Sequence, residues 1–463
     1  MTQHISRRQF IKALGAAGAL GPLALAEQGA QAAAKPNIVV ILSDDQGYVD
    51  SGCYGGKDVR TPNIDRLAAE GVRLTDGYVS CPVCSPTRAG IMTGRYQQRF
   101  GYYTNQASNV AGLPLEEITL AQVLRSAGYA TGAIGKWHLG TQPDRHPMSR
   151  GFDEFYGFLG GAHSYIKLRR EDIPANPIMR GREAIDEQGY LTDLFTREAL
   201  SFIERHKREP FFLYLAYNAV HGPLEATEKY LSRVKADDPK RRTYLAMLAA
   251  LDDGVGAVLD KLEEVGVSEN TLVFFLTDNG GPTPKTTANN GPLRGTKGTV
   301  WEGGIRVPFI VRWPARLPAG KTCSEPVISL DIFPTCLAAA GVPLPRGRTY
   351  DGKNLIPTLA GRSSGPLHEA LFWAFRWSPN GGFWAIRRGE WKLVHDAGTL
   401  HLFNLAEDIG EQRDLAQDKP QLVKELSEQY YEWRKQMADP ITPPAELKQR
   451  LGGKKRRGRG KGK

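Results

Sequence analysis

The chain has 463 residues, of which 41% are hydrophobic and 24% charged, a composition that excludes a disordered protein, a coiled coil and a polytopic membrane protein. Its length allows about two to four ordinary domains, or one large α/β domain with a smaller companion. The net charge is +10, but seven positive charges lie in the last ten residues and a net two in residues 1–34. The body between them is nearly neutral, so we expect no nucleic-acid partner.

Residues 1–34 resemble a twin-arginine signal peptide. Arg7-Arg8 precedes the small and apolar run Ala13–Ala26, which is shorter than the ~20 residues that a membrane-spanning helix needs. Ala30–Ala34 then offers small residues for cleavage. The resemblance implies export of the folded chain by the twin-arginine translocase to the periplasm or the exterior, with an uncleaved anchor as the alternative. No later stretch predicts a membrane span, so we expect no stable membrane insertion.

Four apolar runs predict strands that each end in a polar cluster. These runs are Ile38–Leu42, Tyr129–Ile134, Phe211–Tyr217 and Leu272–Leu276. Helical spacing of apolar residues between them, at Ile64–Ala69, Thr119–Ser126 and Tyr244–Val265, predicts an α/β fold with a mostly parallel sheet flanked by helices. Ligands bind beyond the carboxyl ends of strands in such sheets, so we expect the four polar clusters to meet in one crevice.

The pattern changes after about residue 360 and predicts a second, smaller unit. Short aromatic-rich runs predict antiparallel strands at Leu371–Trp377, Phe383–Arg387, Trp391–His395 and Leu400–Leu405, followed by a helix near Leu422–Met437. We therefore predict a signal peptide at 1–34, a catalytic α/β domain at 35–362, a small α+β subdomain at 363–445 and a basic tail at 446–463. The glycine-spaced charges of the tail predict disorder, with anchoring to an acidic polymer as the alternative.

The segment from Cys81 to Arg95 carries the most specific chemistry. Pro86 suits the first turn of a helix, which would place Cys84 at the helix N-terminus, where free N–H groups and the helix dipole favour an anion. Arg88 follows four residues later on the same helical face. A nucleophile, a guanidinium and a helix N-terminus together suit a tetrahedral oxyanion such as sulfate or phosphate. A thiol packed at a helix start beside a surface arginine is the alternative reading of these residues.

This segment, Cys-Ser-Pro-Thr-Arg followed by Ile-Met-Thr-Gly-Arg, closely resembles the signature of the type I, formylglycine-dependent sulfatases of the alkaline-phosphatase superfamily. The neighbouring residues are most similar to arylsulfatase and N-acetylgalactosamine-6-sulfatase relatives. The resemblance implies that a formylglycine-generating enzyme oxidises Cys84 to an aldehyde whose hydrate is the nucleophile. Cys81 lacks an arginine at the matching offset, and Thr87 stands where many members have serine. The family fold implied is a central mixed, mostly parallel sheet.

The polar clusters after the first and fourth strands match the metal ligands of that family. Asp44, Asp45, Asp278 and Asn279, with the converted Cys84, are the metal ligands that the resemblance implies. Carboxylate and amide oxygens suit a hard divalent cation. The family's usual ion is Ca²⁺, and the ligand types leave Mg²⁺ and Mn²⁺ open. A turn or a helix cap is the alternative reading of Asp-Asp or Asp-Asn-Gly alone.

Four basic residues match further motifs of the family. They are Lys136 and His138 in Gly-Lys-Trp-His, His221 in Val-His-Gly-Pro, and Lys297 in Gly-Thr-Lys-Gly. With Cys84 and Arg88 they form the predicted catalytic set. Arg88, Lys136, Lys297 and the metal are expected to neutralise the sulfuryl oxygens. We expect His221, with Lys297, to protonate the departing alcohol, and His138 to deprotonate the second hydroxyl of the aldehyde hydrate so that sulfate is expelled.

The sequence thus predicts a sulfuric ester hydrolase that acts on sulfated carbohydrates, with aryl sulfates as artificial substrates. Two alternatives remain: a phosphomonoester or phosphonate monoester hydrolase on the same scaffold, and an inactive polysaccharide-binding protein in which Cys84 is not converted. The loop Gly161–Tyr165 and the aromatic strands around Trp373–Trp377 are candidates for lining the sugar pocket, although an aromatic stripe more often packs in the core. Five cysteines are an odd number for an oxidising compartment, and their spacing selects no pairing.

Overall fold

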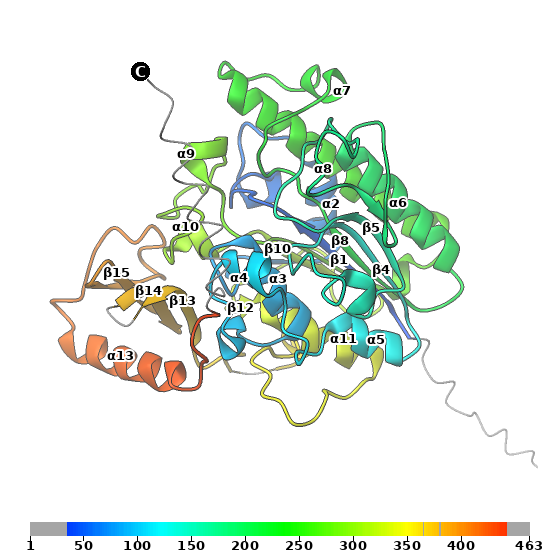
Figure 1. Ribbon diagram of the computed structural model, residues 1–463. Coiled ribbons are helices and arrows are strands. Elements are labelled where there is room, and N and C mark those ends of the chain that lie inside the picture. The colour runs from blue at the N-terminus through cyan, green and yellow to red at the C-terminus, as the bar shows by residue number, and fades with distance from the viewer. Residues whose placement is uncertain (1–34, 364, 379–380, 442–463) are drawn as a thin grey trace, which may run out of the picture. The chain divides into compact units, whose positions relative to one another are not determined.

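A ten-stranded sheet runs through the computed structural model, which describes residues 35–363, 365–378 and 381–441 (Figure 1). Its strands, in chain order, are β1 (Asn37–Ser43), β2 (Val72–Leu74), β4 (Ala130–Lys136), β5 (Glu154–Phe158), β6 (Met179–Arg180), β7 (Glu183–Ala184), β8 (Phe211–Ala216), β9 (Thr271–Thr277), β10 (Phe309–Arg312) and β11 (Lys321–Cys323). Side by side they take the order β11-β2-β10-β9-β1-β8-β4-β5-β6-β7. The predicted signal peptide and basic tail lie outside the described residues.

The centre of the sheet is parallel and fully buried. β1 pairs in parallel with β8 and β9, and β4 pairs in parallel with β5 and β8, whereas β10 is antiparallel to β9. Every residue of β1 is buried, which explains its continuous apolar run, because strands covered on both faces need no polar side. Ile38, Val40 and Leu42 enter one core, and Val39 and Ile41 enter the other.

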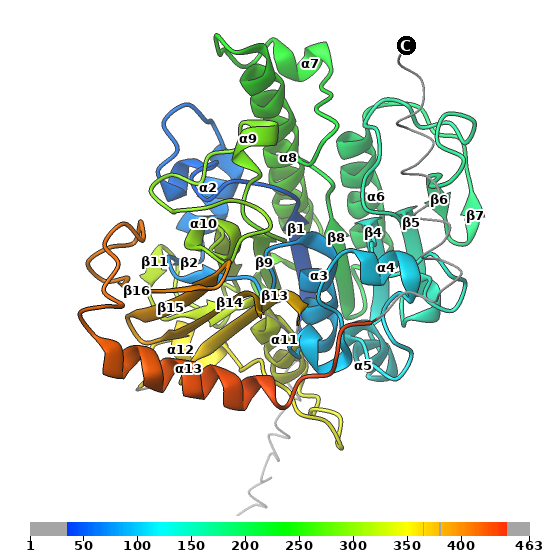
Figure 2. The ribbon, with the colours of Figure 1, turned by 60° about the vertical axis from the view of Figure 1, so that its left-hand side comes forward.

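Helices cover both faces of the sheet, as Figure 2 shows. One core contains residues of α2 (Pro62–Ala69), α6 (Leu191–His206) and α8 (Pro239–Glu264). The other contains residues of α3 (Cys84–Thr93), α5 (Leu120–Ser126) and α11 (Ile332–Ala340). The result is a three-layer α/β/α arrangement, and the predicted fold class is confirmed.

Local sequence signals set several helix ends. Thr119 and Gln122 form a capping box at the start of α5, which satisfies N–H groups that a helix start leaves free. Gly94 ends α3 with φ 66°, a conformation that glycine adopts without steric cost. Helix α8 begins at Pro239, five residues before the predicted Tyr244, because the Asp238 side chain caps it and proline suits its first position.

The second sheet has four antiparallel strands with one helix along it (Figure 1). They are β13 (Leu371–Ser378), β14 (Gly381–Arg388), β15 (Trp391–Asp396), β16 (Thr399–Asn404) and α13 (Pro420–Arg434). All five correspond to predicted elements, although α13 ends before the predicted Met437. Trp373, Leu393 and Leu426 belong to the same core as α3 and α11. The two sheets therefore share a hydrophobic core, and the division at residue 362 stays a prediction.

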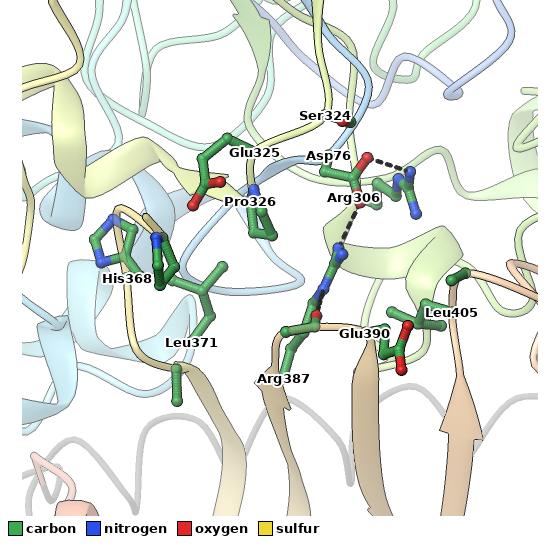
Figure 3. A pocket seen from close by; sticks show the side chains of 14 residues that line it. Asp76, Arg306, Ser324, Glu325, Pro326, His368, Leu371, Arg387, Glu390 and Leu405 are labelled. Carbon is green, nitrogen blue, oxygen red and sulfur yellow. Dashed lines mark hydrogen bonds and ion pairs between the residues drawn. The ribbon is translucent and has the colours of Figure 1, made fainter. Parts of the chain in front are cut away.

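Buried ion pairs also join the two sheets. In Figure 3, Arg306 and Arg387 each contact one oxygen of the Asp76 carboxylate, with N···O distances of 2.9 and 2.7 Å. Lys392 of β15 lies 2.7 Å from Glu302 and 2.8 Å from Glu411, with all three side chains fully buried. Because an unpaired buried charge is costly, these pairs constrain how the second sheet sits on the first.

The remaining elements are short and connect the larger ones. They are β3 (Gly77–Tyr78), β12 (Val327–Ile328), α4 (Gln106–Val110), α7 (Glu228–Leu231), α9 (Thr283–Thr286), α10 (Glu302–Ile305), α12 (Ile356–Leu359), and the 3₁₀ turns Gly52–Tyr54, Gln97–Phe100, Pro147–Ser149, Ser268–Asn270 and Ser329–Asp331. Within the described ranges, no helix is both long and apolar enough to span a membrane. None of the five cysteines, all of which are described, forms a disulfide.

The packing of β9 generates a stability prediction. Leu276 is fully buried one residue before the strand ends, so Leu276→Ala should lower the free energy of unfolding by about 2–5 kcal/mol through lost burial and a residual cavity. Leu115 is 48% exposed, and Leu115→Ala should cost less than about 0.5 kcal/mol. Urea denaturation followed by fluorescence measures both. Equal costs for the two variants would contradict this description of the core.

Candidate active site

The strand order brings the predicted polar clusters together at one edge of the sheet. β9, β1, β8 and β4 are consecutive neighbours, with Leu42 in register with both Ala216 and Leu276. Asp44 and Asp45 follow β1, and Asp278 and Asn279 follow β9. The carboxyl ends of these parallel strands therefore deliver four candidate metal ligands to one place, as expected for this class of sheet.

Cys84 is the first residue of α3 and is 2% exposed. Its Sγ lies 3.2 Å from the Nζ of Lys297. One ligand atom from each of Asp44, Asp45, Cys84 and His221 falls within 4.8 Å of the others. Burial raises the pKa of the Cys84 thiol, although Lys136 and Lys297 act in the opposite direction. The thiol as such is therefore a weak nucleophile at neutral pH.

The carboxylates of this cluster are buried among cations. Arg88 donates from Nε to Asp278 Oδ2 at 2.9 Å, and its Nη2 lies 3.6 Å from Asp44 Oδ2. Lys136 Nζ donates to Asp44 Oδ2 at 2.5 Å. Burial would raise the pKa of Asp44, but the charges of Lys136 and His221 outweigh it and hold the pKa well below its usual range. Burial and the neighbouring Asp44 raise the pKa of Asp278.

Three buried oxygens of this cluster accept no hydrogen bond from any described residue: Asp44 Oδ1, Asp278 Oδ1 and Asn279 Oδ1. The Nδ2 of Asn279 donates to Asp45 Oδ1 at 2.7 Å, and Lys297 Nζ donates to the same oxygen at 2.5 Å. Buried polar atoms are normally satisfied by a hydrogen bond or an ion. The unsatisfied atoms are carboxylate and amide oxygens, so this part of the site fits a hard divalent cation.

Both histidines interact electrostatically with Asp44 of this cluster. His138 follows β4 with φ 59°, and Asp45 has φ 62°, a left-handed conformation that costs energy in residues other than glycine and is common at functional sites. Burial and the charge of Lys136 hold the pKa of His138 well below its usual value. His221 Nε2 is 3.6 Å from Asp45 Oδ2, and burial lowers its pKa as well. The lowered pKa of His138 favours its neutral form, which can accept a proton.

A cavity of about 790 Å³ opens onto this cluster. Its lining includes Asp45, His221 and Lys297, so the reactive end of the site is accessible from it. A second cavity, of about 380 Å³, lies between the two sheets beside Asp76 (Figure 3). There the Arg306 and Arg387 guanidiniums are already paired with Asp76. The larger cavity is therefore the better candidate for a substrate site.

Several residues of this cavity were missed by the sequence reasoning. Asn105 Oδ1 accepts from Ser85 N–H at 3.0 Å, and its Nδ2 lies 4.0 Å from Cys84 Sγ. Lys240, Lys285 and Arg376 also line the cavity. Asn105 lies outside every recognised motif, whereas Lys240 carries one signal: it is a cation in the first turn of α8, where the helix dipole disfavours positive charge.

The predicted sugar-pocket segments are placed differently from the expectation. Gly161–Tyr165 does not line the cavity; a Cβ at Gly161 would come 2.7 Å from the His138 ring, so this loop packs against that histidine. Trp373 is fully buried and donates from its indole to Val79 O. Among residues 373–376, whose side chains are described, Arg376 lines the cavity. Trp373 and Phe375 belong to the shared core.

Comparisons with known proteins agree with this geometry. The family model described as Sulfatase matches residues 36–342, and the model described as N-sulphoglucosamine sulphohydrolase, C-terminal, matches residues 296–436. The N-acetylgalactosamine-6-sulfatase of Canis lupus familiaris is 37% identical over 376 residues, which is 75% of this chain and 68% of that protein. The human steryl-sulfatase is 34% identical and covers 76% of each chain.

A solved structure extends the likeness to the whole fold. The crystal structure of Ps i-CgsB in complex with k-i-k-neocarrahexaose matches with a TM-score of 0.84 at 35% identity. The match covers 88% of this chain and 95% of that chain. The family model matched at residues 296–436 spans the four-stranded sheet, so the likeness to sulfatases is not confined to the ten-stranded sheet.

Proposed function

The chain belongs to the sulfatase family, within the alkaline-phosphatase superfamily, and we propose that it removes sulfate from carbohydrates by means of an aldehyde formed from Cys84. It is a sulfatase that hydrolyses sulfate monoesters. The observation that carries the proposal is the convergence of Cys84, Lys297 and the acidic cluster at the floor of an open cavity.

Similarity to proteins with sugar ligands supports a carbohydrate substrate. One relative is named an N-acetylgalactosamine-6-sulfatase, and Ps i-CgsB binds k-i-k-neocarrahexaose. The cavity of about 790 Å³ also offers apolar surface from Val83, Pro223 and Leu224 beside its polar groups. Such a mixture suits a sugar ring, which has apolar faces and polar edges. Aryl sulfates remain suitable artificial substrates.

A buried thiol is a weak nucleophile, and conversion of Cys84 to formylglycine would give the site a better one. The aldehyde hydrate would supply one hydroxyl to attack sulfur and a second through which sulfate can leave. Cys84 is the first residue of α3 and therefore lies at the positive end of the helix dipole, which favours an anion. Asn105 accepts a hydrogen bond from the Ser85 N–H and holds its own amide near the reacting atom. These contacts suit a tetrahedral oxyanion.

Asp44, Asp45, Asp278 and Asn279 would hold the divalent cation, with Ca²⁺ as the proposed ion. Their unsatisfied buried oxygens are the observation that supports it. A bound cation would polarise a sulfuryl oxygen and ease ionisation of a nearby hydroxyl. Mg²⁺ and Mn²⁺ accept the same ligand types.

The basic residues have different roles in charge neutralisation and proton transfer. The charges of Lys136 and Lys297 both act on position 84 and neutralise sulfuryl oxygens, while Arg88 balances the buried Asp278 carboxylate at 2.8–2.9 Å. His221 lines the cavity, where the alcohol leaves, and protonates it with Lys297. His138 is more deeply buried and neutral, so it accepts the proton whose loss releases sulfate.

Substitution of Cys84 tests the nucleophile. Cys84→Ala should lower kcat for 4-nitrophenyl sulfate by at least about 10³-fold, because no other group replaces the lost nucleophile. Cys81→Ala is the matched control, since Cys81 is also buried but its Sγ donates to Tyr103 O, and it should remain active. Mass spectrometry of the wild-type peptide should find the aldehyde at position 84. Full activity of Cys84→Ala would refute the assignment.

Removal of the metal tests the acidic cluster. Treatment with a chelator should abolish hydrolysis and lower the Tm, because Asp44 and Asp278 lose a cation that binds only the folded state. Addition of Ca²⁺ should restore both. The Tm of Asp278→Ala, which lacks one ligand, should respond far less to Ca²⁺. If the chelator changed neither the Tm nor the activity of wild type, a required metal at these residues would be excluded.

We also propose export to the periplasm or the exterior by the twin-arginine translocase. The proposal rests on the arginine pair and the following apolar run in residues 1–34, which lie outside the described residues. Because that route carries folded chains, a formylglycine-generating enzyme would have to act on Cys84 before transport.

Arg7→Lys combined with Arg8→Lys should therefore retain the protein in the cytoplasm, with Cys84 already converted. Lys12→Arg leaves the pair intact and should be exported normally. Cell fractionation followed by mass spectrometry of the Cys84 peptide measures both features. Export of the double variant at the wild-type level would rule out this route, and unconverted thiol in the cytoplasmic pool would rule out the order of events.

A further inference from the structure

Three cations line the mouth of the active-site cavity and take no part in the catalytic steps described above. Lys240 comes from the first turn of α8, Lys285 from α9 and Arg376 from β13. All three are exposed. Among the described residues, none of the three side chains has a hydrogen bond or an ion pair, although the Arg376 guanidinium lies over the Phe375 ring. Three separate segments thus bring unneutralised charge to one opening.

The position of Lys240 is unfavourable for stability. The first turn of α8 holds no acidic residue, and the positive end of the helix dipole repels a cation there. The next residue, Arg241, is compensated by ion pairs with Asp50 and Asp58 at 3.0 and 2.9 Å. The Lys240 ammonium forms no ion pair with a described residue, although the capping Asp238 carboxylate accepts the Lys240 backbone N–H at 2.9 Å. A residue that opposes its local environment without a structural gain is expected mainly at functional sites.

The backbone at Arg376 is also unusual. Its φ is 48°, which is strained for a residue with a side chain. The register between β13 and β14 shifts between Phe375 and Ser378, and such a bulge turns a side chain away from its regular direction. Phe375 remains buried in the shared core, whereas Arg376 is exposed and lines the cavity. The irregularity thus lets the four-stranded sheet contribute a charge to the active site.

The cavity offers these cations no internal counter-charge. Among the described residues of its lining, Asp45 is the one carboxylate, and it already accepts hydrogen bonds from Lys297 and Asn279. Sulfate at the point of cleavage is served by Lys136, Lys297 and the helix N-terminus. Lys240, Lys285 and Arg376 therefore remain available for further negative charge on the same substrate, and a concave wall strengthens their attraction for it.

We propose that Lys240, Lys285 and Arg376 form a subsite for a second anionic group, so that the preferred substrate is a saccharide bearing at least one more sulfate or carboxylate besides the ester that is cleaved. The inference rests on the proposed carbohydrate sulfatase function and names its substrate class. Recognition of the second anion adds binding energy remote from sulfur, and it therefore acts mainly on KM.

The test compares disaccharides that share the cleaved ester but carry either one or two anionic groups, with sulfate release measured by ion chromatography. Wild type should favour the doubly charged substrate in kcat/KM by about tenfold or more. The triple variant Lys240→Ala, Lys285→Ala, Arg376→Ala should lose most of this preference, chiefly through KM. Raised salt should weaken the wild-type preference and have little effect on that of the triple variant.

Two controls separate subsite recognition from general charge or folding effects. Lys57 and Arg362 are exposed and do not line the cavity, so the double variant Lys57→Ala, Arg362→Ala should keep the wild-type preference. Lys240→Arg, which retains the charge, should keep most of it. A Tm for the triple variant close to that of wild type shows that the exposed substitutions leave the fold intact.

The outcomes distinguish the two levels of the proposal. If wild type with converted Cys84 hydrolysed neither 4-nitrophenyl sulfate nor any sulfated sugar, the proposed function itself would be overturned. Hydrolysis with an equal or opposite preference between the paired substrates would overturn the subsite alone. An unchanged preference in the triple variant would also overturn it, because the preference would then arise elsewhere.

Discussion

A balance of buried charges holds the active site together. Asp44 and Asp278 are completely buried, and Arg88 and Lys136 contact them from α3 and the end of β4. Removing either the cations or the carboxylates would leave an uncompensated buried charge, which proteins tolerate poorly. The same balance leaves carboxylate and amide oxygens without hydrogen-bond partners. The site therefore folds with its charged groups paired, and its unsatisfied oxygens leave a place that fits a divalent cation.

The sheet makes this balance possible because β9, β1, β8 and β4 are direct neighbours. Their common direction places chemical groups from positions far apart in the sequence at a single edge, while their apolar bodies fill two cores. The four-stranded sheet supports the same edge. Glu411 accepts from the Glu302 N–H, and its carbonyl accepts from Arg294, which fixes both ends of the segment that carries Lys297. The segment that follows the second sheet thus contacts the loop that carries Lys297.

The inner and outer parts of the cavity suit different tasks, catalysis and substrate recognition. Its floor, with Asp45, His221 and Lys297, is built from closely paired groups whose geometry is held by neighbours. Its mouth carries exposed cations from α8, α9 and β13 whose charges are not neutralised within the described residues. A rigid floor suits chemistry on an invariant sulfuryl group, because preorganised charges need no rearrangement during reaction. An open, charged mouth suits recognition of the part of the substrate that differs between sulfate esters.

The sequence by itself determined the fold class, because continuous apolar runs and helical periodicity are local patterns that burial preserves. It also predicted that Cys84 and Arg88 lie near the pairs Asp44-Asp45 and Asp278-Asn279. Their motifs follow strand ends or open a helix. Only the tertiary structure decided that Asn105, Lys240, Lys285 and Arg376 share one cavity, and that Trp373 packs in the core and not against a substrate. The physical reason is that these neighbours come from segments with no common motif or period, so their proximity arises only when the helices and both sheets pack.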